Sequence, residues 1–182
     1  QVFVKWWESP THLLPIPAGY KARWQRALMP LVAAWAGGVP LEFTALYGMR
    51  TYGNGSWLIT HTDRQDTHAL SLVLNLHQDE TAHWPFHIDD VNGTTHEVFL
   101  EPGEMIFYES AACTHGRPVP LVGVDFVNMF AHFRPRGDPG WYRERATVAD
   151  APYGPVAQRW VADLEAQWPQ EQKKLDVRRR EH

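Results

Sequence analysis

The chain has 182 residues, which is enough for one well-buried domain and short for two. Its net charge of -4 at pH 7 gives no reason to expect a nucleic acid or an anionic membrane as partner. The hydrophobic fraction of 44% is ordinary for a globular protein, whereas nine Trp and 14 Pro predict short elements separated by many turns. We therefore expect a single domain over residues 1–182.

Cysteine usage and targeting patterns bear on the compartment. The single cysteine, Cys113, cannot form a disulfide within the chain, which fits a reducing environment. No stretch resembles a signal peptide or is long and apolar enough to span a bilayer. We expect a cytoplasmic protein, and the sequence leaves its oligomeric state open.

Residues 1–40 are expected to form a helical support. Apolar residues recur at helical spacing after Pro17, namely Tyr20, Trp24, Ala27, Leu28 and Leu31. Pro30 is expected to kink or restart this helix, because proline removes a backbone donor and clashes with the preceding turn. Gly37, Gly38 and Pro40 then end the helical region.

From Leu41 onward, short runs typical of strands alternate with Gly, Pro, Asn and Asp. The expected strands are residues 42–52, 57–61, 67–76, 85–89, 96–100, 105–108, 112–115 and 123–133. This order predicts a mainly β fold with flanking helices, a double-stranded β-helix (a jelly roll or cupin-like barrel) over residues 41–135. Residues 136–182 are expected to add a loop, a helix over 155–168 and a charged tail.

One ambiguity concerns the last expected strand. Asn128 and His132 share one face of it, and Met129 and Phe133 share the other. The pattern alone does not decide which face lines the barrel.

Two short motifs supply the ligands of a possible metal site. His61-Thr62-Asp63 ends one expected strand, and Thr114-His115-Gly116 follows on a later one. Two imidazoles and one carboxylate suit a divalent first-row metal such as Fe(II) and can bind it on one face. Three ligands leave positions open for a bidentate cosubstrate and for O2. The sequence therefore predicts that His61, Asp63 and His115 form an open metal site.

The context of these motifs resembles a known family. Tyr52-Gly53-Asn54-Gly55 precedes the strand that ends in His61, and Pro102-Gly103 precedes the strand before His115. Pro118-Val119 and Gly123 follow the distal histidine. Over residues 46–135 this order resembles the iron and 2-oxoglutarate dependent dioxygenases, most closely their prolyl 4-hydroxylase-like branch.

The resemblance implies a function and a set of cofactors. It implies a jelly roll whose His61, Asp63 and His115 hold Fe(II), with 2-oxoglutarate and O2 as cosubstrates and ascorbate as reductant. The reaction would be hydroxylation of an aliphatic C–H bond in a small molecule or peptide, with proline or a prolyl peptide as the expected substrate. Tyr52 matches a family tyrosine that can hydrogen-bond the cosubstrate, and Asp63 argues against a halogenase.

One position departs from the family pattern. Prolyl 4-hydroxylases place a Lys or Arg some nine or ten residues after the distal histidine, where this chain has Val124-Asp125. A carboxylate buried without a cation is costly, so another base must meet the distal carboxylate of 2-oxoglutarate. Arg117 is our candidate because residues two apart on a strand share a face with each other, here with His115. Arg64 and Arg134 are the competitors, and a surface salt-bridge role for Arg117 stays open.

Two other functions compete with this interpretation. A cupin-like metalloprotein that does not use 2-oxoglutarate would share the barrel, although its first motif normally offers two His and a Glu. A non-catalytic jelly-roll binding module would explain the missing Lys. Metal content and turnover of 2-oxoglutarate separate the three functions.

Overall fold

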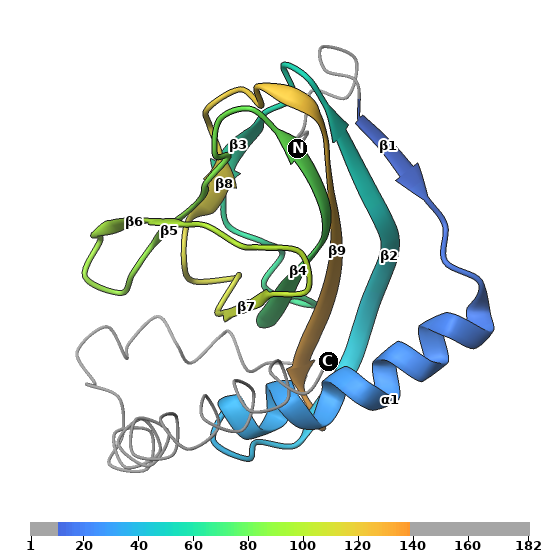
Figure 1. The fold of residues 1–182 in the computed structure, drawn as a ribbon. Coiled ribbons are helices and arrows are strands. Elements are labelled where there is room, and N and C mark those ends of the chain that lie inside the picture. The colour runs from blue at the N-terminus through green and yellow to red at the C-terminus, as the bar shows by residue number, and fades with distance from the viewer. Residues whose placement is uncertain (1–10, 139–182) are drawn as a thin grey trace, which may run out of the picture. The chain divides into compact units, whose positions relative to one another are not determined.

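The computed structural model describes residues 11–138, which form two antiparallel sheets facing each other (Figure 1). The five-stranded sheet has the order β1 (Thr11–Leu14), β2 (Leu41–Gly53), β9 (Gly123–Pro135), β4 (Leu70–Glu80) and β7 (Met105–Tyr108). The four-stranded sheet has the order β3 (Leu58–His61), β8 (His115–Arg117), β5 (Phe86–Asp89) and β6 (Thr95–Val98). This arrangement confirms the double-stranded β-helix.

Two strands differ from the prediction in ways that matter for the site. β8 begins at His115 rather than at residue 112, because the amides of Ala112 and Cys113 donate to the Glu109 carbonyl in a turn, at 3.0 and 2.8 Å. The strand instead extends to Arg117. The edge strand β1 was not predicted, and it pairs with the second half of β2.

The N-terminal helix α1 (Ala18–Trp35) contacts the outer side of the five-stranded sheet. It continues through Pro30 instead of restarting there. Pro30 is exposed, so water can reach the carbonyl that loses its helical donor. The buried side chains of α1 are Leu28 and Val32, whereas Leu31, which the spacing placed on the apolar face, is exposed. This helix is not long and apolar enough to cross a membrane.

The two faces of β9 pack against different clusters, which resolves the ambiguity of the sequence. Met129, Ala131 and Phe133 belong to the apolar core that includes Leu28 and Val32 of α1. Phe126 and Phe130 pack instead with side chains between the two sheets, among them Trp84 and Phe86. Because alternate residues share a face, Asn128 and His132 line the barrel interior with Phe126 and Phe130.

The close approach of β8 to β3 depends on Gly116. A Cβ atom at this position would lie 2.9 Å from the carbonyl oxygens of Leu58 and Ile59. Glycine therefore lets the two strands that carry His61 and His115 pack backbone against backbone.

The structure describes only part of the three segments predicted from the sequence. Within residues 11–40 the structure has the predicted helix, α1, and also the strand β1, and the strands β2 to β9 lie within residues 41–135. The predicted helix over 155–168 and the charged tail lie outside the residues that the structure describes, so these two remain predictions.

Candidate metal centre

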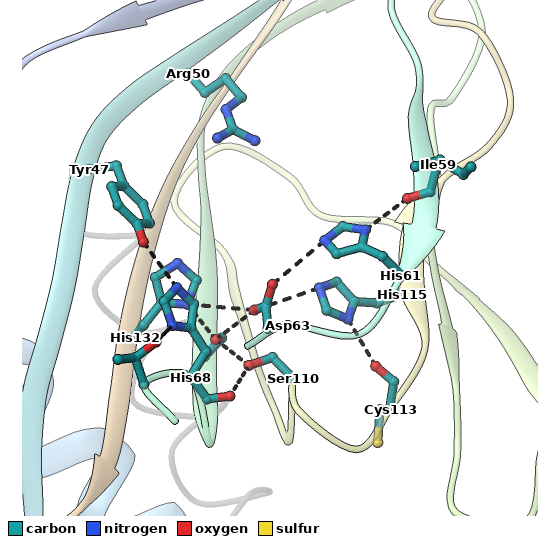
Figure 2. A network of polar contacts seen from close by, with 12 residues as sticks. Tyr47, Arg50, Ile59, His61, Asp63, His68, Ser110, Cys113, His115 and His132 are labelled. Carbon is teal, nitrogen blue, oxygen red and sulfur yellow. Dashed lines mark hydrogen bonds and ion pairs between the residues drawn. The ribbon is translucent and has the colours of Figure 1, made fainter. Parts of the chain in front are cut away.

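The structure brings His61, Asp63 and His115 together at one end of the paired strands β3 and β8. His61 and His115 are direct partners across the two strands, and Asp63 follows His61 by two residues. Nε2 of His61 lies 3.6 Å from Oδ1 of Asp63, and Nε2 of His115 lies 3.9 Å from Oδ2 (Figure 2). Within residues 11–138, this is the one group of three such side chains whose ligand atoms all lie within 4.8 Å of one another.

Backbone carbonyls fix the orientation of both imidazoles. Nδ1 of His61 lies 2.8 Å from the Ile59 carbonyl oxygen, and Nδ1 of His115 lies 2.9 Å from that of Cys113. A carbonyl oxygen only accepts, so each Nδ1 carries the proton and donates it. In the neutral form of each imidazole, Nε2 then has a lone pair directed toward Asp63, and this is the tautomer that binds a metal.

Burial and neighbouring charges set the protonation states of the site. Burial acts to raise the pKa of the Asp63 carboxyl, but His61, His115 and His132 together hold that pKa well below its usual range. Burial lowers the pKa of His115 to about 4. At neutral pH, Asp63 is therefore ionised and His115 is neutral, and these are the forms in which both side chains bind a metal.

His61 shifts in the other direction. Burial acts to lower its pKa, but contact with the Asp63 carboxylate and the Ile59 carbonyl outweighs burial and raises it. A raised pKa means that His61 keeps a second ring proton, on Nε2, up to a higher pH. A metal must displace this proton, so metal affinity should depend on pH mainly through His61.

Arg117 lies two residues beyond His115 on β8, and its side chain is one of the most deeply buried in the chain, with 2% exposed. Its guanidinium carbon lies 4.4 Å from the centre of the Trp84 ring and 4.5 Å from that of Phe126, with Phe86 at 5.8 Å. We call Trp84, Phe86 and Phe126 the aromatic box. The surface salt-bridge role that the sequence left open does not fit this position.

The hydrogen bonding of Arg117 is incomplete. Nη1 donates to the Trp84 carbonyl oxygen, whereas Nη2 is buried and has no partner among residues 11–138. Among these residues no carboxylate forms a direct ion pair with the guanidinium, although the charge of Glu80 acts on it. Burial lowers its pKa to about 10, which still leaves it charged at neutral pH. A buried cation of this kind is costly unless an anion binds beside it.

The two competing arginines already have carboxylate partners. Arg64 has a side chain that is 70% exposed and pairs with Asp66 at 3.0 Å. Arg134 donates to Glu42 and, at 3.0 Å, to the Asp66 carbonyl oxygen. Asp125, which stands where the family pattern has a cation, pairs with His77 at 3.4 Å on the face of β9 opposite Phe126.

Tyr52 lies in the barrel interior, and a cation that the sequence did not single out lies beside it. The Tyr52 side chain is fully buried, and its ring centre is 5.1 Å from that of Trp84. Nη1 of Arg50 donates to the Tyr52 hydroxyl at 3.3 Å, and its guanidinium lies over the Phe130 ring. Figure 2 shows Arg50 pointing from β2 toward the metal ligands. Its spacing of two residues from Tyr52 was the available signal.

Comparison with known proteins supports the fold. No family model matches the sequence, and no curated protein matches it. Among solved structures, the chain is similar to a prolyl-4-hydroxylase from Pseudomonas putida, with 21% identity, 70% of this chain and 72% of that chain covered, and a TM-score of 0.50. It shares the fold of this prolyl 4-hydroxylase.

A second solved structure has the same architecture. It is a prolyl hydroxylase from Trichoplax adhaerens in complex with a peptide fragment of hypoxia inducible factor, with 10% identity, 78% of this chain and 66% of that chain covered, and a TM-score of 0.50. The prolyl 4-hydroxylase fold that the sequence motifs predicted is thus found by structure, although at low sequence identity.

Proposed function

We propose that the chain is an Fe(II) and 2-oxoglutarate dependent dioxygenase that hydroxylates an aliphatic C–H bond. The observation that carries this proposal is the triad of His61, Asp63 and His115, whose ligand atoms all lie within 4.8 Å of one another. Three ligands of this kind suit Fe(II) and leave open positions for a bidentate cosubstrate and O2. The prolyl 4-hydroxylase fold supports proline or a prolyl peptide as the substrate.

The residues divide the work with the metal. Fe(II), when bound, would supply the activation of O2 that couples decarboxylation of 2-oxoglutarate to hydroxylation. His61 and His115 would hold it through Nε2, because their Nδ1 atoms donate to backbone carbonyls. Asp63 would add the charged ligand that favours a divalent cation.

Arg117 is the proposed partner of the distal carboxylate of 2-oxoglutarate, and Tyr52 the proposed hydroxyl contact. Residues two apart on a strand are separated by roughly 7 Å, so Arg117 lies within reach of a small dicarboxylate whose other end binds at the metal. The buried Nη2 without a partner supports this role. A guanidinium can bind a carboxylate through two parallel hydrogen bonds.

The test combines metal binding with turnover. The purified chain, given Fe(II), ascorbate and O2, is expected to convert 2-oxoglutarate to succinate, slowly alone and faster with the right prolyl peptide or amino acid. Calorimetry should also detect binding of 2-oxoglutarate to the protein loaded with Mn(II) in the absence of O2. Metal binding without 2-oxoglutarate binding would favour the cupin-like metalloprotein, and absence of both would favour the binding module.

A further inference from the structure

A buried hydroxyl on β4 contacts the carboxylate of the metal triad from behind. The Ser71 side chain is 0% exposed, and its Oγ lies 3.4 Å from Oδ2 of Asp63. Other side chains contact the same hydroxyl, among them Ser110 through Oγ at 2.5 Å and His132 through Nδ1 at 2.6 Å. Figure 2 shows Ser110 and His132 on the side of Asp63 away from the two imidazoles. The function proposed above does not use any of the three.

The protons of this network can be counted. Ser110 donates its hydroxyl proton to the His68 carbonyl oxygen at 2.9 Å, and its own carbonyl accepts the Asp63 amide at 2.8 Å. At 2.5 Å from Ser71 Oγ, Ser110 can also donate its proton to Ser71. The single proton of Ser71 then has two acceptors within reach, Asp63 Oδ2 at 3.4 Å and, when the ring proton of His132 is on Nε2, His132 Nδ1 at 2.6 Å. The ionised carboxylate is the stronger acceptor, because a hydrogen bond to a charged oxygen is roughly twice as strong as a neutral one.

This contact falls on the oxygen of Asp63 that could otherwise become a second ligand. Oδ1 lies near His61, but Oδ2 also lies only 3.9 Å from Nε2 of His115. Both carboxylate oxygens could thus reach a metal held by the two imidazoles. A bidentate carboxylate would fill four positions of a six-coordinate metal and leave only two. A bidentate cosubstrate and O2 together need three.

We propose that Ser71 is a positioning residue that holds Oδ2 of Asp63 by a hydrogen bond, so that Asp63 gives the metal one oxygen and leaves three positions open. Ser110 and His132 hold Ser71 in place. The inference rests on the metal site proposed above, and it concerns how many positions that site leaves free.

Mn(II) is the probe for the test, because it suits oxygen and nitrogen ligands and its bound waters are measured by the relaxation of water protons. The wild-type protein, free of 2-oxoglutarate, should keep three waters on Mn(II). Ser71→Ala should keep two, so relaxation per bound Mn(II) should fall by about a third, and Mn(II) affinity should change by up to about 10–100-fold, as is typical when a residue supporting a metal ligand is lost. Ser71→Thr retains the hydroxyl and should recover the third water.

Ser56→Ala is the matched control, because Ser56 is also 0% exposed but lies outside this network. It should bind Mn(II) with three waters and wild-type affinity. Thermal melting shows whether each variant is folded. If Ser71→Ala does not fold, Ser110→Ala decides, because it leaves the Ser71 hydroxyl in place to donate to Asp63 and should keep three waters.

The outcomes separate the two proposals. A wild-type protein that binds neither Mn(II) nor Fe(II) overturns the metal site and this inference with it. Wild-type binding with three waters in folded Ser71→Ala, or two waters in Ser110→Ala, overturns only the role of Ser71. A loss of affinity in Ser71→Ala without a change in water number also overturns it, since that result fits a merely structural hydroxyl.

Discussion

The metal centre and the pocket of Arg117 lie two residues apart on β8, yet they treat charge in opposite ways. Around Asp63, three histidine rings and a serine hydroxyl surround one carboxylate and hold it ionised. Around Arg117, the aromatic box surrounds one guanidinium, and no carboxylate of residues 11–138 pairs with it. The first region has a surplus of cation ligands, and the second has a buried cation without a direct carboxylate partner. A ligand that chelates a metal and carries a distant carboxylate satisfies both regions at once.

The largest expected effect comes from removing a ligand on the cation side. His61→Ala, Asp63→Ala or His115→Ala should each abolish metal binding and turnover, because a site of three ligands loses most of its affinity with any one of them. Iron content and succinate formation measure the two effects. Full iron occupancy in all three variants would show that His61, Asp63 and His115 do not bind the metal.

On the anion side, Arg117→Ala should raise the apparent KM for 2-oxoglutarate by about tenfold to a hundredfold, because a charge-assisted contact contributes roughly 1.5–3 kcal/mol. Iron affinity should hardly change. Arg117→Lys should recover only part of the loss, because a point charge does not reproduce the planar fork.

Arg64→Ala and Arg134→Ala are controls, since both residues are paired with carboxylates. Arg50→Ala is the informative rival, because Arg50 bonds Tyr52 and points toward the metal ligands. An unchanged KM for 2-oxoglutarate in Arg117→Ala, together with a raised KM in Arg50→Ala, would show that Arg50 and not Arg117 binds the distal carboxylate.

Thermal stability tests whether the buried charge of Arg117 serves ligand binding or the fold. Arg117→Met retains an apolar stem of similar length and removes the buried charge, so Tm without ligand should be unchanged or higher. The rise in Tm that 2-oxoglutarate gives the wild-type protein loaded with Mn(II) should be lost or much reduced in this variant. A large drop in Tm without ligand would show that the guanidinium is a structural group.

A smaller effect tests the strand that joins the two regions. Gly116→Ala should destabilise the protein by about 1–3 kcal/mol, because forcing atoms into a packed site displaces the backbone, and here the added Cβ would lie 2.9 Å from the Leu58 and Ile59 carbonyl oxygens. Metal affinity and 2-oxoglutarate affinity should fall together. Gly19→Ala, where nothing lies within 4 Å of the new Cβ, is the control. Denaturant unfolding measures both variants.

A further effect is a dependence of stability on pH in the metal-free protein. Burial lowers the pKa of His115 to about 4 and that of His132 to about 3, from 6.5. The unfolded chain therefore binds protons first as pH falls, and each histidine lowers the free energy of unfolding below pH 6.5, by about 1.4 kcal/mol per unit at most. His61, whose pKa is raised, acts in the opposite direction.

Denaturant unfolding with a chelator, at pH values between 7.5 and 4.5, should therefore show stability falling toward acid. His132→Asn, which keeps a donor near Nδ1, should show a shallower fall. An equal slope in the two proteins would mean that His132 is not held neutral by the fold.

How much the sequence could predict depended on the range of the interactions involved. His61 and Asp63 are two residues apart at a strand end, and His115 was placed at the end of a later strand, so ligand chemistry and local pattern were enough to select the three residues that the structure brings together. Ser71 and His132 could not be found in this way. They meet Asp63 only because β4 pairs with β9 in a particular register, and that ladder contains a shift between Asn75 and His77 that the sequence did not reveal.

Arg117 falls between these cases. The two-residue period of a strand correctly placed Arg117 on the same face as His115, even though the predicted strand ended too early, at residue 115. Its burial did not follow, because the aromatic box gathers Trp84, Phe86 and Phe126 from three separate segments.

The metal ligands belong to one sheet and their supports to the other, and this gives the centre a mechanical consequence. His61 and His115 lie on β3 and β8, whereas Ser71 and His132 lie on β4 and β9. A bound metal would therefore cross-link β3 and β8 within one sheet and add about 2.7 kcal/mol of stability at a free concentration one hundred times its Kd. The short strands β3 and β8 should gain the most protection from amide hydrogen exchange when the metal binds.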